Sequence, residues 1–284
     1  MAGKLLSDEL WESIEHLFPV NAPSPLGGRP TVDNRTALTV ILFVLKTGVS
    51  WEDAPQELGC SGKTASRRLV EWNEQGVWRK VHAYLLAQLN GADQIDWSRS
   101  LLDSSLVKAP LGGENGGPNP TDRGRSGSKH HLLTDAGGVP LAITVSAANT
   151  HDLKAALPTV VDVPPVKGKR GRPRRRPDSL VADKAYDAQD FRALLQWLGI
   201  HPLIARRGDS CRGLGKARWP VERTFAWLHQ FRRLRTRWDK RADVHQAFLH
   251  LAAAVICHRI HVSGFCPYAL SLTHLLTTHL LTNK

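Results

Sequence analysis

Apolar residues change their spacing once along this chain, between about residues 91 and 98, and this change constrains the fold more than any other feature. Before it, apolar side chains recur every three or four positions, which is typical of amphipathic helices. After it, short apolar runs are separated by turn residues and by further helical segments. We therefore predict an all-helical domain over residues 1–95, an α/β domain over 96–262 and a short tail over 263–284.

The helical part contains a candidate DNA-reading motif. The pattern predicts a short helix over residues 51–58, a tight glycine turn, and a second helix over 61–74 that Ser61 caps. The second helix leaves basic and hydroxyl side chains outward. Its DNA-binding candidates are Lys63, Thr64, Ser66, Arg67 and Arg68. Such a pair of helices fits either a helix-turn-helix that binds DNA or an ordinary helical hairpin, and these residues alone leave both interpretations open.

The second part alternates between extended and helical patterns. It is predicted as a strand, a hairpin, a helix, a strand, a helix, a strand and two helices, over residues 101–107, 130–145, 152–161, 179–182, 188–198, 201–204, 218–238 and 244–260. This order predicts a mixed α/β sheet with flanking helices.

Three carboxylates stand at notable places in that order. Asp103 lies in the first strand, Asp183 follows a central strand, and Glu222 lies on a helix. Open α/β sheets place their sites beyond the carboxyl ends of strands. Three converging carboxylates repel one another unless hard cations neutralise them, and two Mg²⁺ ions would also promote attack on a phosphodiester. The alternative is three unrelated surface carboxylates, although an Asp within an apolar strand is costly to bury without a partner.

The formal net charge of +12 is concentrated in two segments. Residues 162–178 carry seven basic and two acidic side chains, and residues 206–241 carry twelve and three. Residues 1–95, by contrast, carry nine basic and eleven acidic side chains. Positive charge gathered in this way indicates a polyanionic partner such as nucleic acid.

Each basic segment supplies candidate phosphate contacts. The first forms a Pro-flanked loop over 164–177 that we expect to lie beside the metal site. Its candidates are Lys169, Arg170, Arg172, Arg174, Arg175 and Arg176. A simply solvated loop is the alternative. In the second segment we expect one long helix to carry Arg232, Arg233, Arg235 and Arg237 after Glu222, where they would hold a DNA strand.

Several stretches of the second part resemble bacterial insertion-sequence transposases of the DDE type, in insertion-sequence family five. The matching stretches are Asp103-Ser104-Ser105, Asp122-Arg123-Gly124-Arg125, Gly127-Ser128-Lys129-His130-His131, Val181-Ala182-Asp183-Lys184-Ala185-Tyr186-Asp187, Pro202-Leu203-Ile204-Ala205-Arg206-Arg207-Gly208 and Arg218-Trp219-Pro220-Val221-Glu222-Arg223-Thr224-Phe225-Ala226-Trp227-Leu228. The resemblance implies a ribonuclease-H-like fold in which Asp103, Asp183 and Glu222 are the catalytic metal ligands. It also implies a divalent metal cofactor, here two Mg²⁺ ions with Mn²⁺ as a substitute.

Related elements also carry a Tyr, an Arg, the catalytic Glu and a Lys in a fixed ladder. Arg218, four residues before Glu222, occupies the Arg place, and His229 stands at the Lys place. Gly215 stands at the Tyr place, so this part of the ladder is altered. The resemblance therefore adds Arg218 and His229 to the DNA-binding candidates. Lys129, which lies in one of the matching stretches, is a further candidate.

The function that the resemblance implies is binding of transposon terminal inverted repeats, cleavage of the ends, and transfer of the 3′-OH ends to target DNA. Double-stranded DNA is then the partner, with at least a homodimer on DNA. The scattered cysteines and the absence of a signal-like or membrane-spanning run predict a cytoplasmic, nucleoid-associated protein. The alternatives are a metal-dependent nuclease of the same fold and a DNA-binding regulator derived from an inactive element.

Overall fold

The computed structural model describes residues 5–20, 30–206 and 214–263, with the side chains of 214–217 left aside. The predicted tail therefore lies almost wholly outside the described residues. The helices are α1 (Asp8–Ile14), α2 (Asn34–Thr47), α3 (Gly62–Glu74), α4 (Val77–Gly91), α5 (Asp152–Val161), α6 (Gln189–Trp197), α7 (Leu214–Leu228), α8 (Arg232–Arg235) and α9 (Ala242–Ser263). The strands are β1 (Ser100–Lys108), β2 (Gly117–Pro118), β3 (Ser126–Asp135), β4 (Pro140–Ala147), β5 (Ser179–Ala182) and β6 (His201–Ile204).

Local sequence signals begin the N-terminal helices. The side chains of Ser7, Asp33 and Ser61 each accept a hydrogen bond from a backbone N–H in the first turn of α1, α2 and α3. These bonds satisfy donors that the helix itself leaves unpaired. At the other end of α2, Gly48 adopts φ 74°, the left-handed conformation that ends many helices.

The helix predicted over residues 51–58 is wrong. Turns and bends fill most of this segment, and a 3-10 turn covers only Gln56–Leu58. Pro55 supplies a reason, because the residue before a proline is disfavoured in helical conformation. The segment instead packs closely on the start of α3, where a Cβ on Gly62 would come within 1.7 Å of the Trp51 carbonyl oxygen.

The strands form one mixed sheet. Its order is β2-β3-β1-β5-β6, and β4 pairs with β3. The β1–β3 and β3–β4 pairs are antiparallel, whereas β1–β5 and β5–β6 are parallel. An antiparallel meander followed by parallel strands on the far side of β1 is the ribonuclease-H-like arrangement that the resemblance implies, and the predicted α/β fold class is confirmed.

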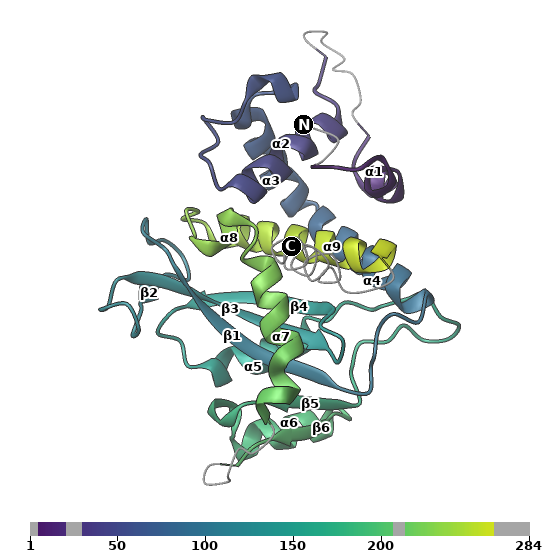
Figure 1. The fold of residues 1–284 in the computed structure, drawn as a ribbon, viewed down its shortest axis with the longest axis vertical. Coiled ribbons are helices and arrows are strands. Elements are labelled where there is room, and N and C mark those ends of the chain that lie inside the picture. The colour runs from purple at the N-terminus through teal and green to yellow at the C-terminus, as the bar shows by residue number, and fades with distance from the viewer. Residues whose placement is uncertain (1–4, 21–29, 207–213, 264–284) are drawn as a thin grey trace, which may run out of the picture.

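Helices cover this sheet and join it to the N-terminal part (Figure 1). α7 crosses the front of the sheet over β1, and α5 packs against β3 and β4. α9 runs beside α4 and contacts β4, so it lies between the sheet and the N-terminal helices. Buried residues of both parts belong to one continuous hydrophobic core, although the proposed boundary falls between α4 and β1. Among the described helices, none is long and apolar enough to cross a membrane.

The single long helix predicted over residues 218–238 is wrong. α7 ends at Leu228, a turn follows, and the short helix α8 ends at Arg235. Beyond it the chain is extended, and the Arg237 backbone N–H donates to the Lys108 carbonyl oxygen at 2.7 Å. The chain leaves the helix because it pairs here with the end of β1.

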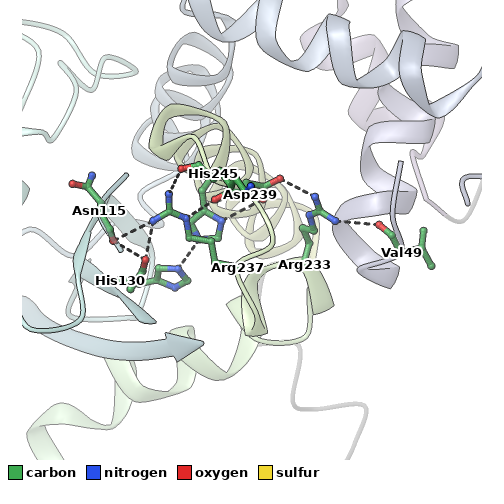
Figure 2. A network of polar contacts seen from close by, with 9 residues as sticks. Val49, Asn115, His130, Arg233, Arg237, Asp239 and His245 are labelled. Atoms are coloured by element: carbon green, nitrogen blue, oxygen red, sulfur yellow. Dashed lines mark hydrogen bonds and ion pairs between the residues drawn. The ribbon is translucent and has the colours of Figure 1, made fainter. Parts of the chain in front are cut away.

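A buried polar network surrounds this extended segment (Figure 2). Asp239 is its centre: Oδ1 accepts from Arg233 Nη2 at 2.7 Å, and Oδ2 lies 3.7 Å from His245 Nδ1. Arg233 also donates to the Val49 carbonyl oxygen in the N-terminal part, and His245 bonds to His130 of β3 at 2.8 Å. Burial would raise the pKa of Asp239, but the neighbouring imidazole of His245 and the charge of Arg233 hold it below its usual value. The network therefore ties the N-terminal helices to the sheet.

Candidate active site

Asp103 and Asp183 are neighbours on adjacent parallel strands. β1 pairs with β5 so that Leu101 stands opposite Val181. Continuing this register by two residues places Asp103 opposite Asp183, which follows the last residue of β5. Side chains two residues apart on a strand share a face. The pairing of the two strands thus brings together two of the three predicted carboxylates.

One arginine of α7 connects the two carboxylates. Arg218 Nη2 donates to Asp103 Oδ2 at 2.6 Å, and Arg218 Nη1 lies 3.8 Å from Asp183 Oδ2. Burial raises the pKa of the Asp103 carboxyl, and the hydrogen bond and charge of Arg218 offset only part of this rise. Burial would lower the pKa of Arg218, but Asp103 and then Asp183 raise it above its ordinary value. The sheet and α7 therefore meet at a compact charged centre.

Glu222 lies one helical turn beyond Arg218 on α7. Its side chain is exposed, and its charge contributes to the raised pKa of Arg218. Within the described ranges, no three His, Cys, Asp or Glu side chains are already arranged as a set of metal ligands. Asp103 and Asp183 thus face one guanidinium group, and Glu222 is exposed one turn farther along α7.

The chemistry of this donor set fits a divalent metal. Carboxylate oxygens are the ligands that hard divalent ions such as Mg²⁺ prefer. Here two of them already face one positive charge, the guanidinium of Arg218. Asp103 Oδ1 accepts the Ser104 backbone N–H at 2.8 Å, and Asp183 Oδ1 accepts that of Ala185 at 2.9 Å. Each Asp therefore has one oxygen held by the backbone and one directed at the cation.

A second polar cluster lies behind Asp103, and the sequence reasoning missed it. Asp152, the first residue of α5, accepts from Ser104 Oγ and Lys129 Nζ at 2.9 Å each. Tyr186 is buried beside this cluster, and burial followed by the charge of Asp152 raises its pKa. Lys129 was predicted to bind DNA, but its exposed fraction is only 9% and its ammonium is paired with Asp152. In this structure it supports the site from behind instead.

The helix-turn-helix candidates cluster on one face of the N-terminal part. Two surface hollows flank α3, and Ser61 and Arg67 line both. All of the predicted reading residues line one or both hollows: Lys63, Thr64, Ser66, Arg67 and Arg68. Arg67 has the more exposed side chain, 70% exposed against 14% for Arg68, and both lie near Glu71, at 3.5 Å and 3.4 Å.

The basic loop over 164–177 is exposed but lies away from the carboxylates. Its predicted phosphate contacts are all exposed: Lys169, Arg170, Arg172, Arg174, Arg175 and Arg176. The loop is fastened to the end of α4, where Asn90 donates to the Lys167 carbonyl oxygen and Lys169 pairs with Asp93. It enters β5 at the N-terminal end, whereas Asp183 follows the C-terminal end. The expectation that it lies beside the metal site is therefore wrong.

The arginines after α7 divide into two groups. Arg232 and Arg235 are exposed, and His229 is half-buried just after the helix, with burial lowering its pKa. Arg233 and Arg237 are 5% and 1% exposed and are held in the buried network of Figure 2. The prediction that Arg233 and Arg237 contact DNA is therefore corrected, because each guanidinium is buried among protein partners.

The sequence reasoning also missed the acidic and histidine partners of these arginines. Asp239 and His245 have no local pattern that marks them, because their partners are at Arg233 and on the distant strand β3. The sequence did offer one indication of such partners. Several arginines lie close together among apolar residues, and burying their charge requires carboxylates or carbonyls nearby.

The fold and the charged centre define a nuclease-type α/β domain preceded by a helical DNA-reading candidate. A family profile for the transposase DDE domain matches residues 98–257, and one for candidate transposases of the IS4/5 family matches residues 6–82. The chain belongs to the DDE transposases of the IS4/5 insertion-sequence group. It is accordingly a DNA transposase, and its family implies the use of a divalent metal ion.

The chain is also similar to individual proteins. A candidate transposase for insertion sequence element IS402 of Burkholderia cepacia is 52% identical over 174 residues, which are 60% of this chain and 81% of the relative. An uncharacterised 16.2 kDa protein of the same element is 50% identical over 123 residues, 42% of this chain and 84% of that protein. A solved paired-end complex of the Mos1 transposase with its left transposon end matches at 14% identity and a TM-score of 0.26, over 80% of this chain and 82% of that one.

Proposed function

We propose that this transposase binds the terminal inverted repeats of its own element, cleaves the ends by hydrolysis and joins the freed 3′-OH ends to target DNA. Asp103, Asp183 and Glu222 would hold the metal, which we propose is Mg²⁺ in two positions, with Mn²⁺ as a substitute. The working form would be a homodimer or larger assembly on DNA, in the cytoplasm at the nucleoid. The observation that carries this proposal is the convergence of Asp103 and Asp183 on one cationic group, one helical turn from Glu222.

The bound metal would supply charge neutralisation at the scissile phosphate and a lowered pKa for the attacking hydroxyl. The residues of this chain would hold the metal-binding carboxylates in position. The backbone N–H groups of Ser104 and Ala185 orient the two Asp carboxylates. Asp152, which accepts hydrogen bonds from Ser104 and Lys129, supports β1 on the opposite face. Glu222, exposed on α7, faces the side from which DNA would approach. This division of work needs no covalent protein intermediate.

The test is a cleavage and joining assay. Duplexes spanning the DNA on either side of the coding sequence would be incubated with the purified chain, Mg²⁺ and a target plasmid. We expect a nick at the outer edge of a repeat that leaves a 3′-OH, and joining of a pre-cleaved end to the plasmid. Cleavage without joining would identify a nuclease instead, and binding without cleavage would identify a regulator derived from an inactive element.

Recognition of the repeats is proposed for the face of α3 between the two hollows. We expect Arg67→Ala to weaken binding to the repeats by about 1–3 kcal/mol if Arg67 contacts a base. If Arg67 contacts a phosphate, the loss of affinity is the same for all DNA sequences. The slope of log K against the logarithm of salt concentration then becomes smaller in magnitude by about one. Fluorescence anisotropy at several salt concentrations measures both quantities.

The matched control is Lys80→Ala, which removes one exposed positive charge from α4. We expect its affinity for the repeats to stay within about twofold of the unchanged protein, because rim charges away from a contact have small effects. Equal losses in the two variants would show that α3 does not form the reading face.

A further inference from the structure

Arg218 occupies the place between Asp103 and Asp183 where a cation is required. Its two terminal nitrogens face Oδ2 of each carboxylate, at 2.6 Å for Asp103 and 3.8 Å for Asp183. The other oxygen of each Asp accepts a backbone N–H. A metal bound through the two Oδ2 atoms would therefore use the oxygens that this guanidinium already neutralises.

A guanidinium and a divalent ion compete for this place. Both carry positive charge, so a metal ion at the two Oδ2 atoms would be repelled by an arginine in contact with them. Leaving the site without a cation is costly, because Asp103 has an exposed side-chain fraction of only 12% and Asp183 adds a like charge beside it. Exchange of one cation for the other avoids both the repulsion and the loss of the counter-ion.

We propose that Arg218 is an exchangeable counter-ion: it holds the Asp103–Asp183 pair in the metal-free protein and is released from both carboxylates when metal binds. This inference rests on the proposed function, in which these carboxylates are the metal ligands. The released side chain remains on α7, one turn from Glu222, and its planar group suits a phosphate oxygen pair. Metal and DNA backbone binding would thus be coupled through one side chain.

The exchange predicts an unusual effect of removing a positive charge from this site. We expect Arg218→Gln to bind Mn²⁺ about tenfold more tightly than the unchanged protein without DNA, because hydrogen bonds to charged groups contribute enough to change affinity by this factor. Arg218→Lys keeps the positive charge, so we expect its Mn²⁺ affinity to stay within about threefold of that of the unchanged protein. Isothermal titration of the full-length protein with MnCl₂ measures these affinities.

The matched control is Arg235→Gln, which removes an exposed positive charge on α8. Its Mn²⁺ affinity should equal that of the unchanged protein. Equal affinities for the unchanged protein, Arg218→Gln and Arg235→Gln would overturn the exchange while leaving the metal site in place. If neither the unchanged protein nor Arg218→Gln bound Mn²⁺, the proposed metal site itself would be wrong, and the exchange with it.

A second measurement needs no variant and so does not depend on folding of Arg218→Gln. Phenylglyoxal modifies arginine side chains, and mass spectrometry reads the extent at each position. We expect saturating Mn²⁺ to increase the modification of Arg218 several-fold, since the guanidinium leaves its carboxylates. Arg192, which pairs with Asp187 at 2.8 Å, serves as the internal reference and should not change. A reactivity of Arg218 that stays constant or falls with Mn²⁺ would overturn the proposal.

Discussion

Asp183→Asn is expected to reduce Mg²⁺-dependent cleavage of the transposon ends by about a thousandfold or more. The substitution removes one charged oxygen from the proposed metal ligands, and the metal supplies several kcal/mol of charge stabilisation at about 1.4 kcal/mol per tenfold in rate. The fold should persist, because an Asn oxygen can still accept the Ala185 N–H that Asp183 accepts at 2.9 Å. Gel assays of end-labelled repeats, at several Mg²⁺ concentrations, measure the loss.

The control for this variant is Asp190→Asn, the same chemical change on the exposed start of α6. We expect its cleavage rate to stay within about twofold, because an exposed carboxylate away from the reacting atoms contributes little. Asp183→Asn with undiminished Mg²⁺-dependent cleavage would show that the catalytic assignment is wrong.

Asp239→Ala is expected to lower the free energy of unfolding by about 3–5 kcal/mol, the usual effect of removing one partner from a buried ion pair. Arg233, 5% exposed, would lose its carboxylate, and His245 would lose the carboxylate that lies 3.7 Å from Nδ1 (Figure 2). Urea titrations followed by circular dichroism measure the change in midpoint and slope.

The structure offers a matched comparison for this second prediction. Asp243 forms an ion pair with Arg241, and both side chains are largely solvated, at 42% and 54% exposure. Asp243→Ala should therefore lower the free energy of unfolding by less than about 1 kcal/mol, because exposed ion pairs and charges at helix ends contribute no more than this. Similar urea midpoints for the two variants would contradict the view that the Asp239 network fastens the N-terminal helices to the sheet.

The network changes how the positive charge of the second basic segment is understood. Of its arginines, Arg218, Arg233 and Arg237 are engaged by protein partners, and Arg232 and Arg235 are exposed. Charge counted along the sequence therefore overstates the surface available to DNA here. The basic loop over 164–177 is different, because its predicted phosphate contacts are all exposed. It offers DNA a contact surface at a distance from the carboxylates.

Local chemistry in the sequence was enough to predict much of the fold. Ser7, Asp33 and Ser61 mark where helices begin, because capping involves only neighbouring backbone groups. The change from helical to alternating spacing near residue 96 likewise predicted where the sheet starts. The resemblance to family motifs predicted Asp103, Asp183 and Glu222 as the catalytic residues without any knowledge of distances.

What only the tertiary structure decided depends on contacts between distant residues. The parallel register of β1 and β5 brings Asp103 to Asp183, and α7 then adds Arg218 between them. The helix that local spacing predicted as continuous ends at Leu228, and the chain after α8 pairs with the end of β1. Burial decides which arginines can bind DNA, and burial is a property of the packed elements. Periodicity reports the face of one element, whereas charge pairing and strand register arise only when two elements meet.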